Sequence, residues 1–171
     1  MRLFIALELP WETRSGLHDL LAEERERYGF LRWTSLENLH VTLRFLGDMN
    51  PRKIADRLSE MHLGSLLPVE FSLFRTGTFG SPPRILWVSG CFSRAVYRLT
   101  SVLGEIPDDR GDKAQGRFIP HVTVARAPRS GSIPSVKLPG ELSGLAGSVT
   151  LYNSTLTPAG PVYERVFQVS S

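Results

Sequence analysis

The residues with the clearest chemical potential are two histidines, each followed two positions later by a threonine. The first motif is HVTL at positions 40–43, and the second is HVTV at positions 121–124. Both lie in apolar, β-branched stretches that predict strands. Side chains alternate across a strand, so His and Thr at i and i+2 share one face while the apolar residues between them face the core. Each motif therefore presents an imidazole beside a hydroxyl from an anchored backbone.

Two imidazoles facing each other provide what an in-line phosphoryl displacement needs. One accepts a proton from the attacking oxygen and the other gives a proton to the leaving oxygen, each with an ordinary pKa of about 6.5. The hydroxyls of Thr42 and Thr123 could donate hydrogen bonds to the non-bridging phosphoryl oxygens. The alternative is that His40 and His121 are ordinary sheet residues and the threonines merely good strand formers. One motif would favour that alternative, whereas the matched pair favours catalysis.

The rest of the chain predicts the elements that must position these motifs. Amphipathic patterns predict helices over residues 11–28, 51–61 and 93–106, and residues 107–116 and 128–147 are expected to be loops. Apolar segments predict strands over 3–9, 38–46, 69–76, 84–89, 117–126, 148–156 and 162–169. Strands and helices are mixed without strict alternation, which favours an α+β fold with largely antiparallel sheets.

Composition narrows the class of protein. A chain of 171 residues with 42% hydrophobic residues can bury one substantial core, so we expect a single domain over residues 1–171. The net charge of +3 is a mild preference for polyanions and falls short of a nucleic-acid coat protein. Cys91 is the only cysteine, which excludes an intrachain disulfide and fits a reducing cytoplasm. We find no signal peptide and no apolar run long enough to span a membrane, so we expect a soluble cytoplasmic protein.

Around both motifs the sequence resembles the 2H phosphoesterase superfamily, and within it the RNA 2′,3′-cyclic phosphodiesterases of bacteria and archaea, also described as 2′-5′ RNA ligase-like. The resemblance covers nearly the whole chain. It is carried by RLFIAL at 2–7, NLHVTLRFLG at 38–47, PRILWV at 83–88, FIPHVTVAR at 118–126 and the stretch 151–163.

This resemblance implies a two-lobed, pseudo-symmetric fold in which antiparallel sheets form a central cleft, helices lie outside, and each lobe contributes one motif. It implies hydrolysis of RNA 2′,3′-cyclic phosphate ends to 2′-phosphomonoesters, without a cofactor or metal. By the same analogy His40 is the proton donor and His121 the proton acceptor, a ranking that the residues alone do not give. The expected substrates are RNA ends, such as those of tRNA fragments, or cyclic nucleotides, and the expected state is a monomer.

Three further residues are candidates for substrate contacts. The arginine that follows the second motif in this family falls on Arg126, as a phosphate ligand. Strict alternation from His121 would put position 126 on the opposite face, so this role requires the strand to end, twist or bulge. Arg44 has the right parity to reach the rim of the cleft, although a solvated surface arginine fits equally well. Among aromatic residues that could stack on a base, which also include Phe4, Phe79 and Trp87, we select Trp33.

Several alternatives stay open. A non-catalytic RNA-end binder would keep the fold, but both motifs are intact. Joining of RNA ends through a 2′-5′ linkage is the microscopic reverse reaction, with a 5′-hydroxyl replacing water. Hydrolysis of a small cyclic nucleotide would use the same residues. A two-histidine metal site is disfavoured because no carboxylate at ligand spacing accompanies either motif.

Overall fold

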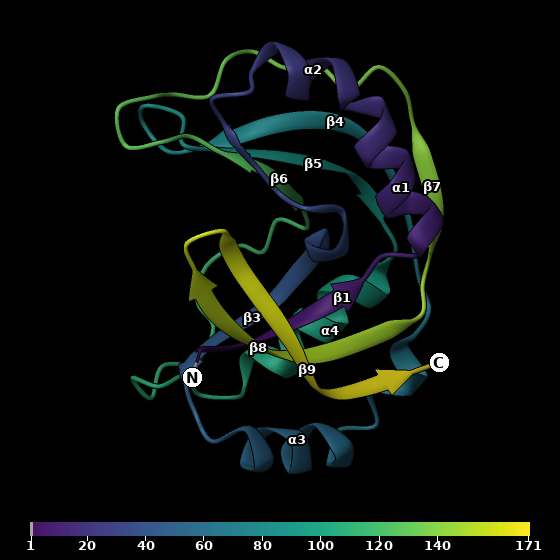
Figure 1. The fold of residues 1–171 in the computed structure, drawn as a ribbon. Helices are drawn as coiled ribbons and strands as arrows, with labels where there is room; N and C mark the ends of the chain where they lie inside the picture. Colours follow the sequence, from purple (N-terminus) through teal and green to yellow (C-terminus); the bar gives the residue numbers. More distant parts are fainter. Residues whose placement is uncertain (1) are drawn as a thin grey trace.

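The computed structural model describes residues 2–171, whose strands form one curled antiparallel sheet (Figure 1). The nine strands lie in the order β7-β4-β5-β6-β3-β1-β8-β9, and the short β2 pairs with β6. Their bounds are β1 Arg2–Glu8, β2 Arg32–Trp33, β3 His40–Asp48, β4 Val69–Phe79, β5 Ile85–Phe92, β6 Val122–Arg126, β7 Leu142–Ala146, β8 Ser148–Thr157 and β9 Gly160–Ser170.

The sheet divides into two halves of four strands. We call β3, β1, β8 and β9 the β3 half-sheet, and β6, β5, β4 and β7 the β6 half-sheet. Each half has its motif strand at the inner edge. The halves meet through the antiparallel pair Val41 and Val122, which are the second residues of the two motifs. Strand order therefore brings together two segments that lie about eighty residues apart in the chain.

Helices cover the outside of this sheet (Figure 1). Helix α1 packs against β7, α3 against β9, and α4 against β3 and β4. Helix α3 begins where Asn50 accepts hydrogen bonds from the backbone N–H groups of Arg52 and Lys53, with Pro51 at the first helical position. The helices are α1 Trp11–Leu20, α2 Ala22–Arg27, α3 Pro51–Glu60 and α4 Arg94–Gly104, with 3₁₀ turns η1 Leu36–Asn38 and η2 Leu63–Leu66. No helix within residues 2–171 is long and apolar enough to cross a membrane.

The predicted α+β class with antiparallel sheets is confirmed, while several predicted boundaries are wrong. The helix expected over residues 11–28 is interrupted at Leu21 and forms α1 and α2. The strand expected over 117–126 begins only at Val122. The loop expected over 128–147 contains β7, whose Gly144 lies so close to the Phe71 ring that an added Cβ would come within 3.0 Å of it. Small residues that permit this approach gave β7 the composition of a loop.

Candidate active site

The two motifs lie on one side of the sheet where its halves meet. His40 is the first residue of β3, and His121 directly precedes β6. Val41 and Val122 are 0% exposed, so the residues on either side of each valine project from the opposite side of the strands. We call this opposite side, which carries His40, Thr42, His121 and Thr123, the histidine face. The expected sharing of a face within each motif follows from this alternation.

Each imidazole is held by its backbone in the same way. Nδ1 of His40 lies 2.7 Å from the Asn38 carbonyl, and Nδ1 of His121 lies 2.7 Å from the Ile119 carbonyl. A carbonyl oxygen only accepts hydrogen bonds, so in both rings Nδ1 carries the hydrogen. Nε2 is then the nitrogen that can gain or lose a proton. In His40 it lies 2.9 Å from the hydroxyl of Thr42.

Aromatic rings surround both histidines. The ring of His40 lies 5.1 Å from Phe4 and 5.5 Å from Tyr163 between centroids. The ring of His121 lies 4.9 Å from Phe79 and 6.4 Å from Trp87. Three of the aromatic residues considered as stacking candidates, Phe4, Phe79 and Trp87, thus contact the histidines. Apolar rings exclude water, which disfavours a charged imidazolium.

The surroundings lower the pKa of both histidines below the ordinary value of 6.5. Burial lowers the pKa of His40, the hydrogen bond to the Asn38 carbonyl opposes that effect, and the charges of His121 and Arg126 lower the pKa further while Glu8 raises it. Burial and the charge of Arg126 lower the pKa of His121, while the hydrogen bond to Ile119 opposes them. The charge of Arg126 therefore reaches both imidazoles.

A β-bulge follows each motif at the same position. Pairing between β1 and β3 skips Leu43, and pairing between β5 and β6 skips Val124. Each skipped residue is the fourth of its motif. A bulge shifts the alternation of side chains by one residue, so the residue five positions after each histidine returns to the histidine face. Those residues are Phe45 in the β3 half-sheet and Arg126 in the β6 half-sheet.

Strict alternation from His121 would place Arg126 on the opposite face of the strand. The bulge at Val124 shifts the alternation and returns Arg126 to the histidine face. Arg126 is exposed and lies opposite Ile85 in β5 and Arg32 in β2. Its charge acts on both histidines and on Tyr163. Arg126 thus lies on the same face as the two motifs, a position that its expected role as a phosphate ligand requires.

The matching bulge at Leu43 places Arg44 elsewhere, which corrects the expectation that it reaches the cleft rim. Arg44 pairs with the buried Ile5 on the face opposite His40. Its guanidinium donates to the Ile106 carbonyl at 3.0 Å and to the Asp112 carbonyl at 2.6 Å. Arg44 therefore binds the loop that follows α4 through these two hydrogen bonds. Strict alternation failed here because a bulge leaves no local signal in the sequence.

Trp33 also lies away from the histidine face. It pairs with the fully buried Ala125, packs partly buried against the core, and donates its indole N–H to the Tyr28 carbonyl at 3.0 Å. The prediction that Trp33 lines the cleft is corrected accordingly. Strand β2 pairs with Ala125 and Arg126 of β6, which follow the bulge at Val124. Trp33 therefore lies opposite the core residue Ala125.

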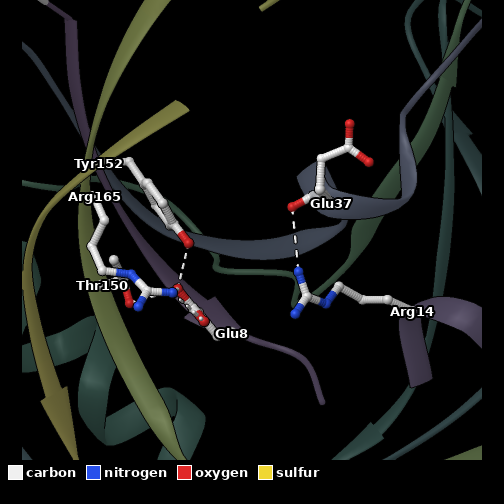
Figure 2. Close-up of polar contacts among 6 residues, drawn as sticks. All are labelled: Glu8, Arg14, Glu37, Thr150, Tyr152 and Arg165. Carbon is white, nitrogen blue, oxygen red and sulfur yellow. Dashed lines mark hydrogen bonds and ion pairs between the residues drawn. The ribbon is translucent and has the colours of Figure 1, made fainter. Parts of the chain in front are cut away.

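A cavity of about 380 Å³ opens beside His40, and its other lining residues lie outside the two motifs. Glu8 lines this cavity and lies directly opposite His40 in the β1–β3 pairing. Thr150, Tyr152 and Arg165 converge on the Glu8 carboxylate, and Arg14 reaches in from α1 on the other side (Figure 2). Although burial raises the pKa of Glu8, hydrogen bonds from Tyr152 and Thr150 and the charges of Arg165 and Arg14 lower it overall, so the carboxylate is ionised.

The only sequence signal for this cavity was the resemblance of the N-terminal strand and of the 151–163 stretch. Neither contains a motif with a chemical meaning of its own.

Within residues 2–171, no group of three or more His, Cys, Asp or Glu side chains is arranged to hold a metal ion.

Comparison with known proteins gives consistent results. A family model described as LigT like Phosphoesterase matches residues 7–87. A protein of Archaeoglobus fulgidus named RNA 2′,3′-cyclic phosphodiesterase is 32% identical over 98% of this chain and 100% of its own length. The crystal structure of TT0787 from Thermus thermophilus superposes with a TM-score of 0.78 at 28% identity, covering 99% of this chain and 97% of that one. The structure of E. coli LigT complexed with 3′-AMP gives a TM-score of 0.72 at 26% identity, with coverages of 99% and 97%.

Proposed function

Because this chain belongs to the LigT-like phosphoesterase family, we propose that it hydrolyses 2′,3′-cyclic phosphate ends of RNA to 2′-phosphomonoesters by metal-independent acid–base catalysis. The observation that carries this proposal is the pair of imidazoles held through Nδ1 on one face of the sheet. Each keeps Nε2 for proton transfer, and Arg126 acts on both. The printed name of the Archaeoglobus relative supports the choice of substrate.

In this mechanism Nε2 of His121 takes a proton from water as the water oxygen attacks phosphorus. The bond from phosphorus to the 3′ oxygen breaks on the opposite side, and Nε2–H of His40 gives its proton to that oxygen. The products are a 2′-phosphomonoester and a free 3′-hydroxyl. Thr42, Thr123 and Arg126 stabilise the non-bridging oxygens, where negative charge is carried through the transition state.

The surroundings of the two histidines support this assignment of roles. Burial lowers the pKa of His40 overall, and the ionised carboxylate of Glu8, which lies opposite His40, opposes that effect and favours the protonated imidazole that a general acid needs. The corresponding position beside His121 is Ser89, one residue beyond the Val88–Val122 pair. Ser89 is neutral, and its buried hydroxyl donates to the Pro120 carbonyl at 2.5 Å. Only His40 therefore has a carboxylate as its cross-strand neighbour.

The test is incubation with an oligonucleotide that ends in a 2′,3′-cyclic phosphate, in EDTA, followed by identification of the product phosphate. We expect a 2′-phosphate to form and His40→Ala to abolish most of the turnover. A 3′-phosphate product would reverse the leaving group. Activity that EDTA removes and divalent metal restores would make the histidines metal ligands instead.

The same assay separates the other candidate functions. An RNA with a 5′-hydroxyl, added to the reaction, would be joined through a 2′-5′ linkage if ligation competes with hydrolysis. Faster turnover of nucleoside 2′,3′-cyclic monophosphates than of oligonucleotides would indicate a small-molecule substrate. Binding of the RNA end without turnover would indicate a non-catalytic binder.

A further inference from the structure

Two arginines lie side by side where the second motif strand ends. Arg126 is the last residue of β6, and Arg32 of β2 lies directly opposite it in the antiparallel pairing of these strands. Directly opposite residues project from the same side of a sheet, so Arg32 shares the histidine face with Arg126. The next pair, Trp33 and Ala125, packs into the core, which agrees with this placement.

The charges of this arginine pair are not neutralised by the protein. Within residues 2–171, neither Arg32 nor Arg126 forms an ion pair or a side-chain hydrogen bond, and both are exposed. In the β3 half-sheet, by contrast, Arg165 is paired with Glu8. Like charges directly opposite each other destabilise a sheet. An anion bound at the arginine pair would relieve this repulsion.

The two arginines are placed for different parts of an anionic ligand. The charge of Arg126 lowers the pKa of both histidines and acts on Tyr163 in β9, so this guanidinium faces the reaction centre. Arg32 lies one strand away from Arg126 and is available for a second anionic group of the same ligand. A guanidinium suits phosphate because it can donate two parallel hydrogen bonds to its oxygens.

We propose that Arg32 binds the phosphate on the 5′ side of the terminal nucleoside, next to the cyclic phosphate that Arg126 binds. The inference rests on the proposed function and names an RNA chain as the substrate. An RNA end carries this second phosphate as a diester, whereas a nucleoside 2′,3′-cyclic monophosphate lacks it. Cβ atoms of a directly opposite pair lie about 4.5 to 5.5 Å apart, so two neighbouring arginines can serve two neighbouring phosphates of one strand.

The experiment measures binding of reaction products, without turnover. Adenosine 2′-monophosphate, adenosine 2′,5′-bisphosphate and the dinucleotide adenylyl-(3′→5′)-adenosine 2′-phosphate are titrated calorimetrically. The bisphosphate adds the 5′ phosphate as a monoester, and the dinucleotide adds it as a diester. We expect the wild type to bind both at least about tenfold more tightly than the monophosphate, because charged hydrogen bonds are added. This advantage should be lost in Arg32→Met, whereas Arg126→Met should weaken binding of all three ligands.

Two controls separate a phosphate contact from other effects of the substitution. Arg52→Met, on the exposed surface of α3, removes the same charge at a distance from the histidine face and should leave the advantage unchanged. Thermal unfolding tests a structural role. Because Arg32→Met removes one of two repelling charges, this variant should melt at a temperature no lower than that of the wild type. A lower melting temperature would overturn the interpretation of Arg32 as an uncompensated charge.

Four binding results would overturn the assignment. They are equal affinities of the wild type for all three ligands, an advantage that Arg32→Met retains, an equal loss of affinity for all three in Arg32→Met, and an advantage confined to the bisphosphate. The third would place Arg32 on the reacting phosphate, and the fourth would indicate a mononucleotide in place of an RNA chain.

Failure of the proposed function is seen separately, as an absence of hydrolysis in the oligonucleotide assay. Loss of the advantage in Arg32→Met together with absent hydrolysis would keep the second phosphate site and remove the reaction.

Discussion

The β3 half-sheet and the β6 half-sheet hold their histidines with the same backbone device. In both, Nδ1 is hydrogen-bonded to the carbonyl two residues earlier, and two aromatic rings lie against the imidazole. In both, the fourth residue of the motif is a bulge, Leu43 in one half and Val124 in the other. The repeated device gives both imidazoles the same tautomer, with the hydrogen on Nδ1.

The two imidazoles differ in the side chains that lie next to them. The β3 half-sheet places Glu8 opposite its histidine, where the β6 half-sheet has Ser89. Beyond the bulges, the β3 half-sheet presents Phe45, which is 67% exposed, where the β6 half-sheet presents Arg126. Acid–base catalysis needs one proton donor and one acceptor. The backbone around the two histidines is therefore similar in both halves, and single side chains make their surroundings different.

The largest effect is expected from removing either imidazole. His40→Ala and His121→Ala should each lower the rate of cyclic phosphate hydrolysis by about 10² to 10⁴-fold, because each removes one proton-transfer group. Steady-state kinetics on the cyclic oligonucleotide measures this loss, and circular dichroism checks that the variants fold. A loss of only a few-fold in either variant would contradict the two-histidine mechanism.

A substrate with a better leaving group distinguishes the two halves. Such a substrate needs less help from a general acid, so it should rescue His40→Ala more than His121→Ala. Preferential rescue of His121→Ala would instead assign the acid to the β6 half-sheet.

The two threonines are expected to contribute less than the imidazoles but similarly to each other. Thr42→Val and Thr123→Val should each cost about 2 to 4 kcal/mol in transition-state stabilisation, if their hydroxyls bind the phosphoryl oxygens. The free-energy change is obtained from kcat/KM of each variant against wild type. No loss in either variant would leave the threonines as strand formers, and a loss in only one would place the phosphate nearer that half.

A smaller loss of activity is expected from replacing Arg126 and Phe45, the two residues that the bulges return to the histidine face. Arg126→Met removes the charge that acts on both histidines, and we expect kcat/KM to fall by about 10 to 100-fold, as for loss of hydrogen bonds from a charged group. Phe45→Met occupies the same position in the other half and should have a smaller effect. Equal losses in the two variants would mean that shape at these positions matters more than charge.

The sequence predicted the fold class and the shared face of each motif in the candidate site, because both depend on local patterns. The apolar alternation in HVTL and HVTV predicts which residues share a face, and the structure has Val41 and Val122 fully buried beneath them. Short-range signals also located α3, where Asn50 and Pro51 mark its first turn.

What could not be predicted depends on pairing between distant strands. The bulges at Leu43 and Val124 are visible only in the register with β1 and β5, and they decide that Arg126 joins the histidines while Arg44 does not. Glu8 ends an apolar strand in the sequence, and only the β1–β3 ladder shows that it faces His40. Trp33 was placed wrongly because a strand of two residues has no periodicity from which its buried face could be read.

The smallest expected effect is a shift in pH dependence, and it tests the difference between Glu8 and Ser89 directly. The rate should follow a bell in pH, whose alkaline limb reports loss of the proton from the acid and whose acidic limb reports protonation of the base. The charge of Glu8 raises the pKa of His40, so Glu8→Gln should lower that pKa and move the alkaline limb to lower pH. The charges of His121 and Arg126 act on the same imidazole and are unchanged in this variant. Ser89→Ala removes the corresponding side chain in the β6 half-sheet and should move neither limb. Profiles of kcat/KM for an oligonucleotide that ends in a 2′,3′-cyclic phosphate make the measurement. A shift of the acidic limb in Glu8→Gln would make His40 the base, because only the limb governed by His40 responds to this carboxylate.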